Sequence, residues 1–85
     1  MVSDELLKIL VCPESRQPVR RADAELVEKV NAAIAAGALK NRAGQAVEEP
    51  VHELLVREDG TIAYAVRDDI PVMLIDEGIP LAQLK

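Results

Sequence analysis

The sequence predicts a small α+β fold, in which an antiparallel sheet of three to four strands carries a short N-terminal helix and one inserted helix. Two observations lead to this fold class. Apolar residues recur at helical spacing over about 23–36, and after Pro50 they form short runs on either side of an Asp-Gly pair, which is typical of a β-hairpin. The chain has 85 residues, so we expect a single domain over 1–85, with a helical insertion at about 22–45.

The first segment predicts a short helix over 3–10. Ser3 is a favourable N-cap, and Asp4 and Glu5 in the first turn suit the helix dipole. Pro13 disfavours helical geometry in the residue before it, so the helix has to end ahead of it. The apolar run inside this segment is also compatible with a strand.

A tight turn at 12–17, a short first strand over 18–21 and the longer helix at about 23–36 follow. Asp23 is the expected N-cap of this helix, and Gly37 is placed to serve as its C-cap. The apolar positions at helical spacing are Leu26, Val27, Val30, Ala33 and Ile34. Such a stripe is most simply a core face, with a partner-binding face as the alternative.

The second half of the chain predicts strands. Residues 52–57 and 61–66 read as two strands joined by the Asp-Gly turn at 58–60. The second strand places three large residues on one face, namely Ile62, Tyr64 and Val66. A proline cannot donate a hydrogen bond to a sheet, so Pro71 lies at a sheet edge or a strand begins at Val72. A short helix or a tail is expected over 79–84.

Composition excludes several classes of function. The formal net charge is -5, and Tyr64 is the only aromatic residue. Nucleic-acid affinity depends on cationic side chains and stacking aromatics, so we expect no direct contact with DNA or RNA. The local groups of basic residues are interpreted as solvated charges on turns and strand edges. They are Arg16, Arg20, Arg21, Lys40 and Arg42.

The sequence also indicates a compartment. A single cysteine cannot form an internal disulfide, which favours a reducing environment. No apolar run approaches the roughly 18 residues needed to span a bilayer, and the acidic start does not look like a signal peptide. We therefore expect a cytoplasmic protein with no membrane partner.

Catalytic and metal-binding patterns are sparse. The four glycines are too scattered for a phosphate-binding loop. Cys12 and His52 are the only conceivable nucleophile and base, and nothing in the sequence brings them together. A structural zinc site needs about four Cys or His ligands, so the sequence predicts no structural zinc. Because the usual catalytic and cofactor-binding motifs are also missing, we expect no cofactor and no enzymatic activity. Asp68 and Asp69 could bind a metal, but adjacent carboxylates on a turn are usually solvated.

Both ends of the chain resemble a known family. The resemblance is carried by Leu6-Leu7-x-Ile9-Leu10-x-Cys12-Pro13 near the start and by Asp59-Gly60-x-Ile62-x-Tyr64-x-Val66-Arg67-Asp68-Asp69-Ile70-Pro71-Val72-Met73-Leu74 near the end. These motifs are similar to those of the small zinc-ribbon-like activator subunits of tRNA-type methyltransferases and their short bacterial relatives. Together they cover roughly residues 3–20 and 55–77.

Three features of that family's pattern are missing here. Zinc-holding members have a Cys-Pro-x-Cys knuckle, whereas this chain keeps Cys12 and has Ser15 in the second place. The second cysteine pair would fall near Arg57 and Gly60, where no cysteine occurs. The usual glycine before Ile-Pro is Asp69 here, although a left-handed backbone costs an L-residue more. The resemblance therefore implies a zinc-ribbon-like but metal-free fold.

The resemblance also implies a function. It implies a non-catalytic subunit that binds, stabilises and activates S-adenosylmethionine-dependent methyltransferases acting on tRNA, rRNA or a translation factor, with S-adenosylmethionine held by the catalytic partner. The expected partner-binding residues are Ile70, Pro71, Val72, Met73 and Leu74. We expect most of them to pack against residues 6–11, leaving Pro71 and Met73 exposed. The alternative is a self-associating structural or regulatory module, a possible homo-oligomer without a methyltransferase partner.

Overall fold

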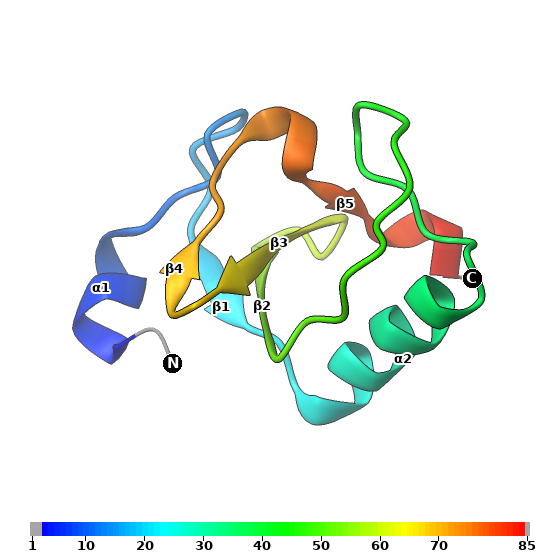
Figure 1. Cartoon of the computed structure of the whole chain (residues 1–85). Helices are drawn as coiled ribbons and strands as arrows, with labels where there is room; N and C mark the ends of the chain where they lie inside the picture. The colour runs from blue at the N-terminus through cyan, green and yellow to red at the C-terminus, as the bar shows by residue number, and fades with distance from the viewer. Residues whose placement is uncertain (1–2, 85) are drawn as a thin grey trace.

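A five-stranded antiparallel sheet forms the centre of the computed structural model, which describes residues 3–84 (Figure 1). The strands are β1 (Val19–Arg21), β2 (Glu53–Arg57), β3 (Ile62–Arg67), β4 (Ile70–Pro71) and β5 (Ile79–Pro80). Their order is β1-β2-β3-β4, and β5 also pairs with β3. The two short strands share one edge of β3, because β5 pairs with its start and β4 with its end.

Two α-helices flank the sheet, and two short 3-10 helices follow in the C-terminal segment. They are α1 (Asp4–Ile9), α2 (Ala24–Ala35), η1 (Ile75–Glu77) and η2 (Leu81–Leu84). Both predicted N-caps are confirmed, since the side chains of Ser3 and Asp23 accept hydrogen bonds from backbone N–H groups. Gly37 follows the end of α2 with a left-handed φ of 69°, as a C-terminal glycine should. The strand alternative for the first segment is wrong.

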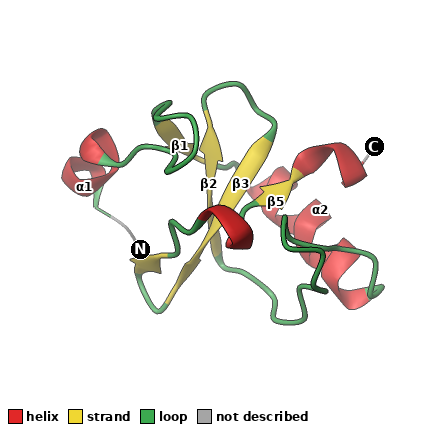
Figure 2. Cartoon of the chain, turned by 90° about the horizontal axis from the view of Figure 1, so that it is seen from above, coloured by secondary structure: helices red, strands yellow, loops and turns green. Residues whose placement is uncertain are grey.

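The sheet is buried on both faces, because alternate residues of β2 and β3 point to opposite sides. One face packs against α2 and the segments that follow it, through Val30, Ile34, Leu39, Val51, Leu54, Val56, Ala63, Ala65 and Ile79. The other face carries Val19, Leu55, Ile62, Tyr64 and Val66 and is covered by Leu6, Leu7, Leu10, Cys12 and Met73. Figure 2 shows α1 and α2 on opposite sides of the sheet. The apolar stripe of α2 is therefore a core face.

The α+β fold class is confirmed, and so is one of the two alternatives for Pro71. β4 spans Ile70–Pro71 at the sheet edge, so the edge alternative is correct and no strand begins at Val72, although the Val72 N–H donates to Ala65 O at 2.9 Å. The segment expected to be a helix or tail begins with a strand, β5, before turning into η2. The Leu81 N–H donates to Thr61 O, and Ile79 is almost fully buried, so tertiary contacts fix this strand.

The turn between β3 and β4 is conformationally unfavourable for its residues. Arg67 pairs with Ile70, so the loop consists of two residues, and both have a left-handed backbone, with φ of 52° at Asp68 and 62° at Asp69. Such two-residue turns usually contain Asn-Gly or Gly-Gly. Asp69, which stands where the resembled family has glycine, therefore adopts the positive φ that glycine would adopt more easily.

Fewer residues of segment 70–74 pack against the start of the chain than the sequence predicts. Of the segment 70–74, only Met73 joins the clusters formed with Leu6, Leu7 and Leu10 and with Tyr64. Ile70 and Leu74 are 65% and 62% exposed. The reason is that the chain leaves the sheet after β4, so most of this segment runs along the edge rather than over the face.

Candidate partner-binding surface and the adjoining knuckle

Cys12 begins a compact turn, here called the knuckle (residues 12–17). The Cys12 N–H donates to Gln17 O and the Arg16 N–H donates to Cys12 O, both at 2.8 Å. Arg16 adopts a left-handed φ of 61°, which closes the turn. Backbone N–H groups at Glu14 and Ser15 are thereby directed at the Cys12 sulfur.

The Cys12 sulfur is fully buried in a polar environment. Tyr64 Oη lies 2.9 Å from Sγ. Burial alone raises the pKa of the Cys12 thiol, but hydrogen bonds from Tyr64 and Ser15 outweigh burial and bring the pKa to about 6. Burial raises the pKa of Tyr64, and its hydrogen bond to Cys12 raises that pKa further, so Tyr64 stays protonated and donates a hydrogen bond to the sulfur.

Arg57, at the end of β2, supplies the positive charge beside this sulfur. Its Nη1 lies 3.8 Å from Cys12 Sγ and 3.4 Å from a carboxylate oxygen of Glu14. Its Nε and Nη2 contact the two oxygens of Asp59 at 3.0 and 2.8 Å, and Nη2 also donates to Thr61 Oγ1. Sequence reasoning named position 57 only as the place of a missing cysteine. In the fold, the guanidinium of Arg57 takes a place near Cys12 and bridges the knuckle to the β2–β3 hairpin.

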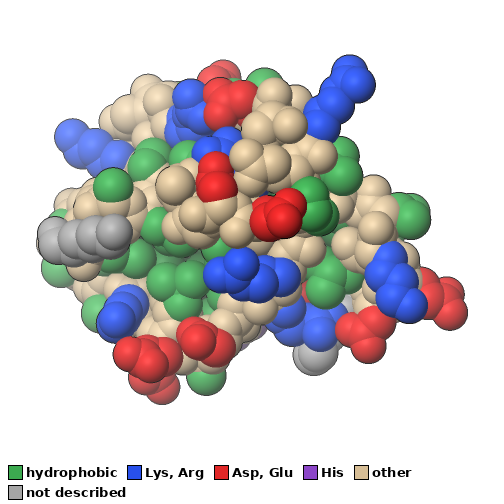
Figure 3. All heavy atoms as spheres, turned by 180° about the vertical axis from the view of Figure 1, so that it is seen from behind, with side chains coloured by type: hydrophobic (Ala, Val, Ile, Leu, Met, Phe, Trp, Pro, Cys, Tyr) green, Lys and Arg blue, Asp and Glu red, His purple; other side chains and the backbone are tan. Residues whose placement is uncertain are grey.

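Other basic residues in the first half of the chain are divided between ion pairs and solvent. Arg21 lies against Asp4 and Glu53, at 3.2 and 3.7 Å, and Arg42 pairs with Glu14. Arg16, Arg20 and Lys40 are exposed, as interpreted from the sequence. Figure 3 shows Lys and Arg side chains interspersed with Asp and Glu on the face seen there.

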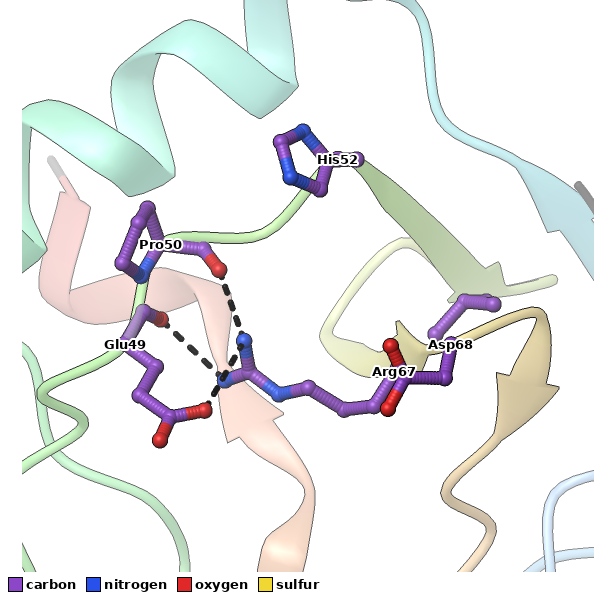
Figure 4. Close-up of a pocket in the computed structure, with 6 residues that line it drawn as sticks. Glu49, Pro50, His52, Arg67 and Asp68 are labelled. Carbon is purple, nitrogen blue, oxygen red and sulfur yellow. Dashed lines mark hydrogen bonds and ion pairs between the residues drawn. The ribbon is translucent and has the colours of Figure 1, made fainter.

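The fold does not bring Cys12 and His52 together. Cys12 contacts Arg57 at the end of β2, whereas His52 precedes the start of that strand, roughly 15 Å away along the chain. His52 instead lines a depression of about 380 Å³ (Figure 4). There the Arg67 guanidinium donates to Pro50 O at 2.7 Å and to Glu49 O at 3.1 Å. No nucleophile–base pair arises from these residues.

Residues 3–84 contain neither a metal-binding cluster nor a helix suited to a membrane. In that part of the chain, no three His, Cys, Asp or Glu side chains come together in a way that could hold a metal ion. Asp68 and Asp69 lie on the exposed β3–β4 turn. Over the same residues, no helix has the length and apolarity required to cross a bilayer.

The expected partner-binding residues divide into exposed and half-buried members. Ile70 and Leu74 are exposed, whereas Pro71, Val72 and Met73 are half-buried. The expectation that Pro71 and Met73 would be the exposed members is therefore wrong, because Met73 packs over Tyr64 and Leu10 instead.

Ile75, which follows directly, is 41% exposed and was missed. Its exposure follows from its place in η1, a single turn that lies on the sheet edge. We refer to Ile70, Leu74 and Ile75 as the apolar strip.

All large hydrophobic side chains that are exposed in the described chain come from two segments. They are Ile9 and Val11 near the start and the three residues of the apolar strip. In both segments, neighbouring residues in the sequence pack on the face of the sheet that carries Leu55 and Val66. Within the described residues, no large hydrophobic side chain of α2 is exposed, and the three residues of the apolar strip lie within six positions of one another.

The backbone beside the apolar strip offers little for strand addition. Because the Val72 N–H points towards β3, the neighbouring backbone groups of Pro71 and Met73 point away from the sheet. Pro71 has no N–H to donate, which blunts this edge. Side-chain contact is therefore the main means of recognition available here.

Comparisons with known proteins give relatives but no activity. No family model matches the chain. A UPF0434 protein of Vesicomyosocius okutanii subsp. Calyptogena okutanii (strain HA) is 26% identical over 77 residues, which is 91% of this chain and 81% of that protein. The solution NMR structure of XF2673 from Xylella fastidiosa matches with a TM-score of 0.79 and 30% identity, covering 98% of this chain and 86% of that one.

Neither of the two names mentions a methyltransferase or any other activity. The match to XF2673 extends over nearly the whole chain, including α2 and its following loop, so the similarity is not confined to the terminal motifs. The chain is thus similar to a UPF0434 protein, and on the identity and coverage of the match to the NMR structure it belongs to the same family as XF2673.

Proposed function

We propose that the chain is a non-catalytic subunit that binds, stabilises and activates an S-adenosylmethionine-dependent methyltransferase acting on tRNA, rRNA or a translation factor. The observation that supports it best is the apolar strip, in which Ile70, Leu74 and Ile75 expose large side chains at a sheet edge. The motif resemblance at both ends of the chain supplies the class of partner.

Burial of the apolar strip can account for a useful affinity. Fully burying one isoleucine or leucine side chain gains about 1.5–3 kcal/mol relative to leaving it exposed. A subunit that binds only the folded form of an enzyme stabilises it by mass action, gaining about 2.7 kcal/mol at one hundred times the dissociation constant. That is enough to rescue a marginally stable catalytic subunit.

The apolar strip is held in place before any partner arrives. Its start is fixed by the β3–β4 pairing at Ile70, and its end by backbone bonds from Arg42 to Gly78 O and from Ala43 to Asp76 O. A surface that is already ordered loses little conformational entropy on binding. In this proposal the chemistry and the S-adenosylmethionine site belong to the partner.

Co-expression tests this function. Each tRNA, rRNA and release-factor methyltransferase of the source organism is produced with and without the chain, and the soluble product is analysed by size-exclusion chromatography with light scattering and by methyl-transfer assay. We expect one enzyme to form an equimolar complex with raised thermal stability and activity. If every enzyme elutes apart from the chain, and the chain alone forms a dimer, the self-associating module is the better account.

A further inference from the structure

A groove lies beside the apolar strip, between the knuckle and η1. It has a volume of about 580 Å³ and is lined by Pro13, Met73, Leu74, Ile75, Asp76 and Glu77. Figure 1 shows the two segments that form it, the loop after α1 and the segment between β4 and β5, passing one another at the same side of the molecule. The groove therefore brings together four apolar side chains and two carboxylates.

The charge of this groove has one sign. Asp76 and Glu77 are exposed, and no Lys, Arg or His is among its lining residues. Within residues 3–84, neither carboxylate takes part in an ion pair. Asp68 adds exposed negative charge at the other end of the segment. The apolar strip is thus flanked by acidic residues on both sides.

We infer that the groove binds a segment of a protein partner in which apolar side chains alternate with lysine or arginine. The apolar side chains occupy the surface of Leu74 and Ile75, and the cationic groups lie against Asp76 and Glu77. Lysine and arginine suit this arrangement because their aliphatic stems pack on apolar surface while the charge stays at the rim. The inference deepens the proposed function, on which it rests, by stating the chemistry of the methyltransferase surface.

Charge also argues against a second copy of the chain as the occupant. A two-fold symmetric contact places the same patch on both subunits, so Asp76 and Glu77 of one copy would face an equally acidic partner. Like charges brought together at an interface cost affinity and slow association. A basic-rimmed partner instead gains electrostatic steering from the net charge of -5.

The test uses short synthetic peptides as probes of the intact, ¹⁵N-labelled chain. A peptide of alternating leucine and arginine is compared with leucine–glutamate and serine–arginine peptides. We expect amide shift changes at residues 73–77 with the first peptide, little binding of the second, and weaker binding of the third because it lacks apolar groups.

The test also compares two double variants, each of which removes two negative charges. Asp76→Asn with Glu77→Gln should weaken binding of the leucine–arginine peptide about fivefold, the effect of losing two exposed charge pairs. Glu25→Gln with Glu28→Gln, on α2, should leave its affinity unchanged. Shift changes away from the groove, or equal weakening by both variants, would overturn the inference.

Failure of the inference and failure of the proposed function give different results. If a methyltransferase complex forms and is equally tight with the two double variants, the groove chemistry is wrong and the function stands. If the peptide binds in the groove as described but no methyltransferase forms a complex, the groove chemistry stands and the class of partner is wrong.

Discussion

The guanidinium of Arg57 lies 3.8 Å from the sulfur of Cys12, across a sequence separation of 45 residues. The knuckle and the β2–β3 hairpin, which are far apart in the sequence, are therefore joined through one cation. The same guanidinium also contacts Glu14, Asp59 and Thr61. Arg57 thus links the start of the chain to the central hairpin.

Replacing Arg57 should be costly for stability. The Arg57 side chain is only 12% exposed, and Arg57→Gln leaves Asp59 without its cationic partner and Glu14 with Arg42 alone. We expect a loss of about 2–3 kcal/mol in the free energy of unfolding, measured by urea denaturation. Arg20→Gln is the matched control, because Arg20 is exposed on β1 and should change stability by less than about 0.5 kcal/mol. Equal effects would mean that Arg57 does not link the two segments.

The stability of the protein should rise with pH through Cys12. The pKa of this thiol falls from 9.0 to about 6 on folding, so between these values the unfolded chain binds a proton that the folded chain does not. The contribution is complete above pH 9 and is lost as the pH falls through 6.

The free energy of unfolding, measured under reducing conditions at intervals across this range, should therefore increase more steeply for the natural chain than for Cys12→Ser. Parallel profiles for the two proteins would contradict a buried thiolate.

Removing the hydroxyl of Tyr64 should shift that titration. Tyr64→Phe keeps the ring in the core but deletes the donor that lies 2.9 Å from Sγ. The pKa of Cys12 should rise above 6, and stability should fall by about 1.5–3 kcal/mol, as for a hydrogen bond to a charged group. Thiolate absorbance in the ultraviolet, followed against pH, measures the first effect, and an unchanged midpoint would show that Tyr64 does not stabilise the thiolate.

The β3–β4 turn should be improved by glycine. Asp68 has a φ of 52°, a conformation that costs an L-residue roughly 1–2 kcal/mol and glycine nothing. Part of the gain is offset by the greater backbone entropy of glycine in the unfolded chain, so Asp68→Gly should stabilise by about 0.5–1 kcal/mol. Asp68→Asn separates the electrostatic part, because it removes the charge beside Asp69 with little change in size. A melting temperature for Asp68→Gly below that of the natural chain would contradict this account of the turn.

The elements predicted correctly from sequence carry local signals. α2 has an N-cap at Asp23, a 3.6-residue apolar period and a glycine at its end, and each of these acts within a few residues. The β2–β3 hairpin depends on its Asp-Gly turn, in which Gly60 adopts a φ of 75°. Such features can be predicted because the physics that determines them is local.

The remaining features depend on contacts between distant residues. β5 exists because Ile79 pairs with Ala63, and a two-residue segment that ends in proline is too short to predict a strand from sequence. Arg57 contacts the knuckle because its position at the end of β2 places it beside Cys12, which no spacing rule in the sequence reveals. The exposed members of segment 70–74 were assigned wrongly because that choice depends on where the chain leaves the sheet.

The central claim is that the apolar strip binds a methyltransferase, and the affinity of the purified complex tests it most directly. Isothermal titration compares the natural chain with a double variant, Ile70→Lys with Leu74→Lys, and with Ile9→Lys as a control at an equally exposed apolar site outside the strip. We predict that the double variant, still folded by its amide spectrum, weakens binding at least a hundredfold, since two lysines would enter an apolar contact. The control should bind within about threefold of the natural chain. Equal affinity of the double variant and the natural chain would contradict the account.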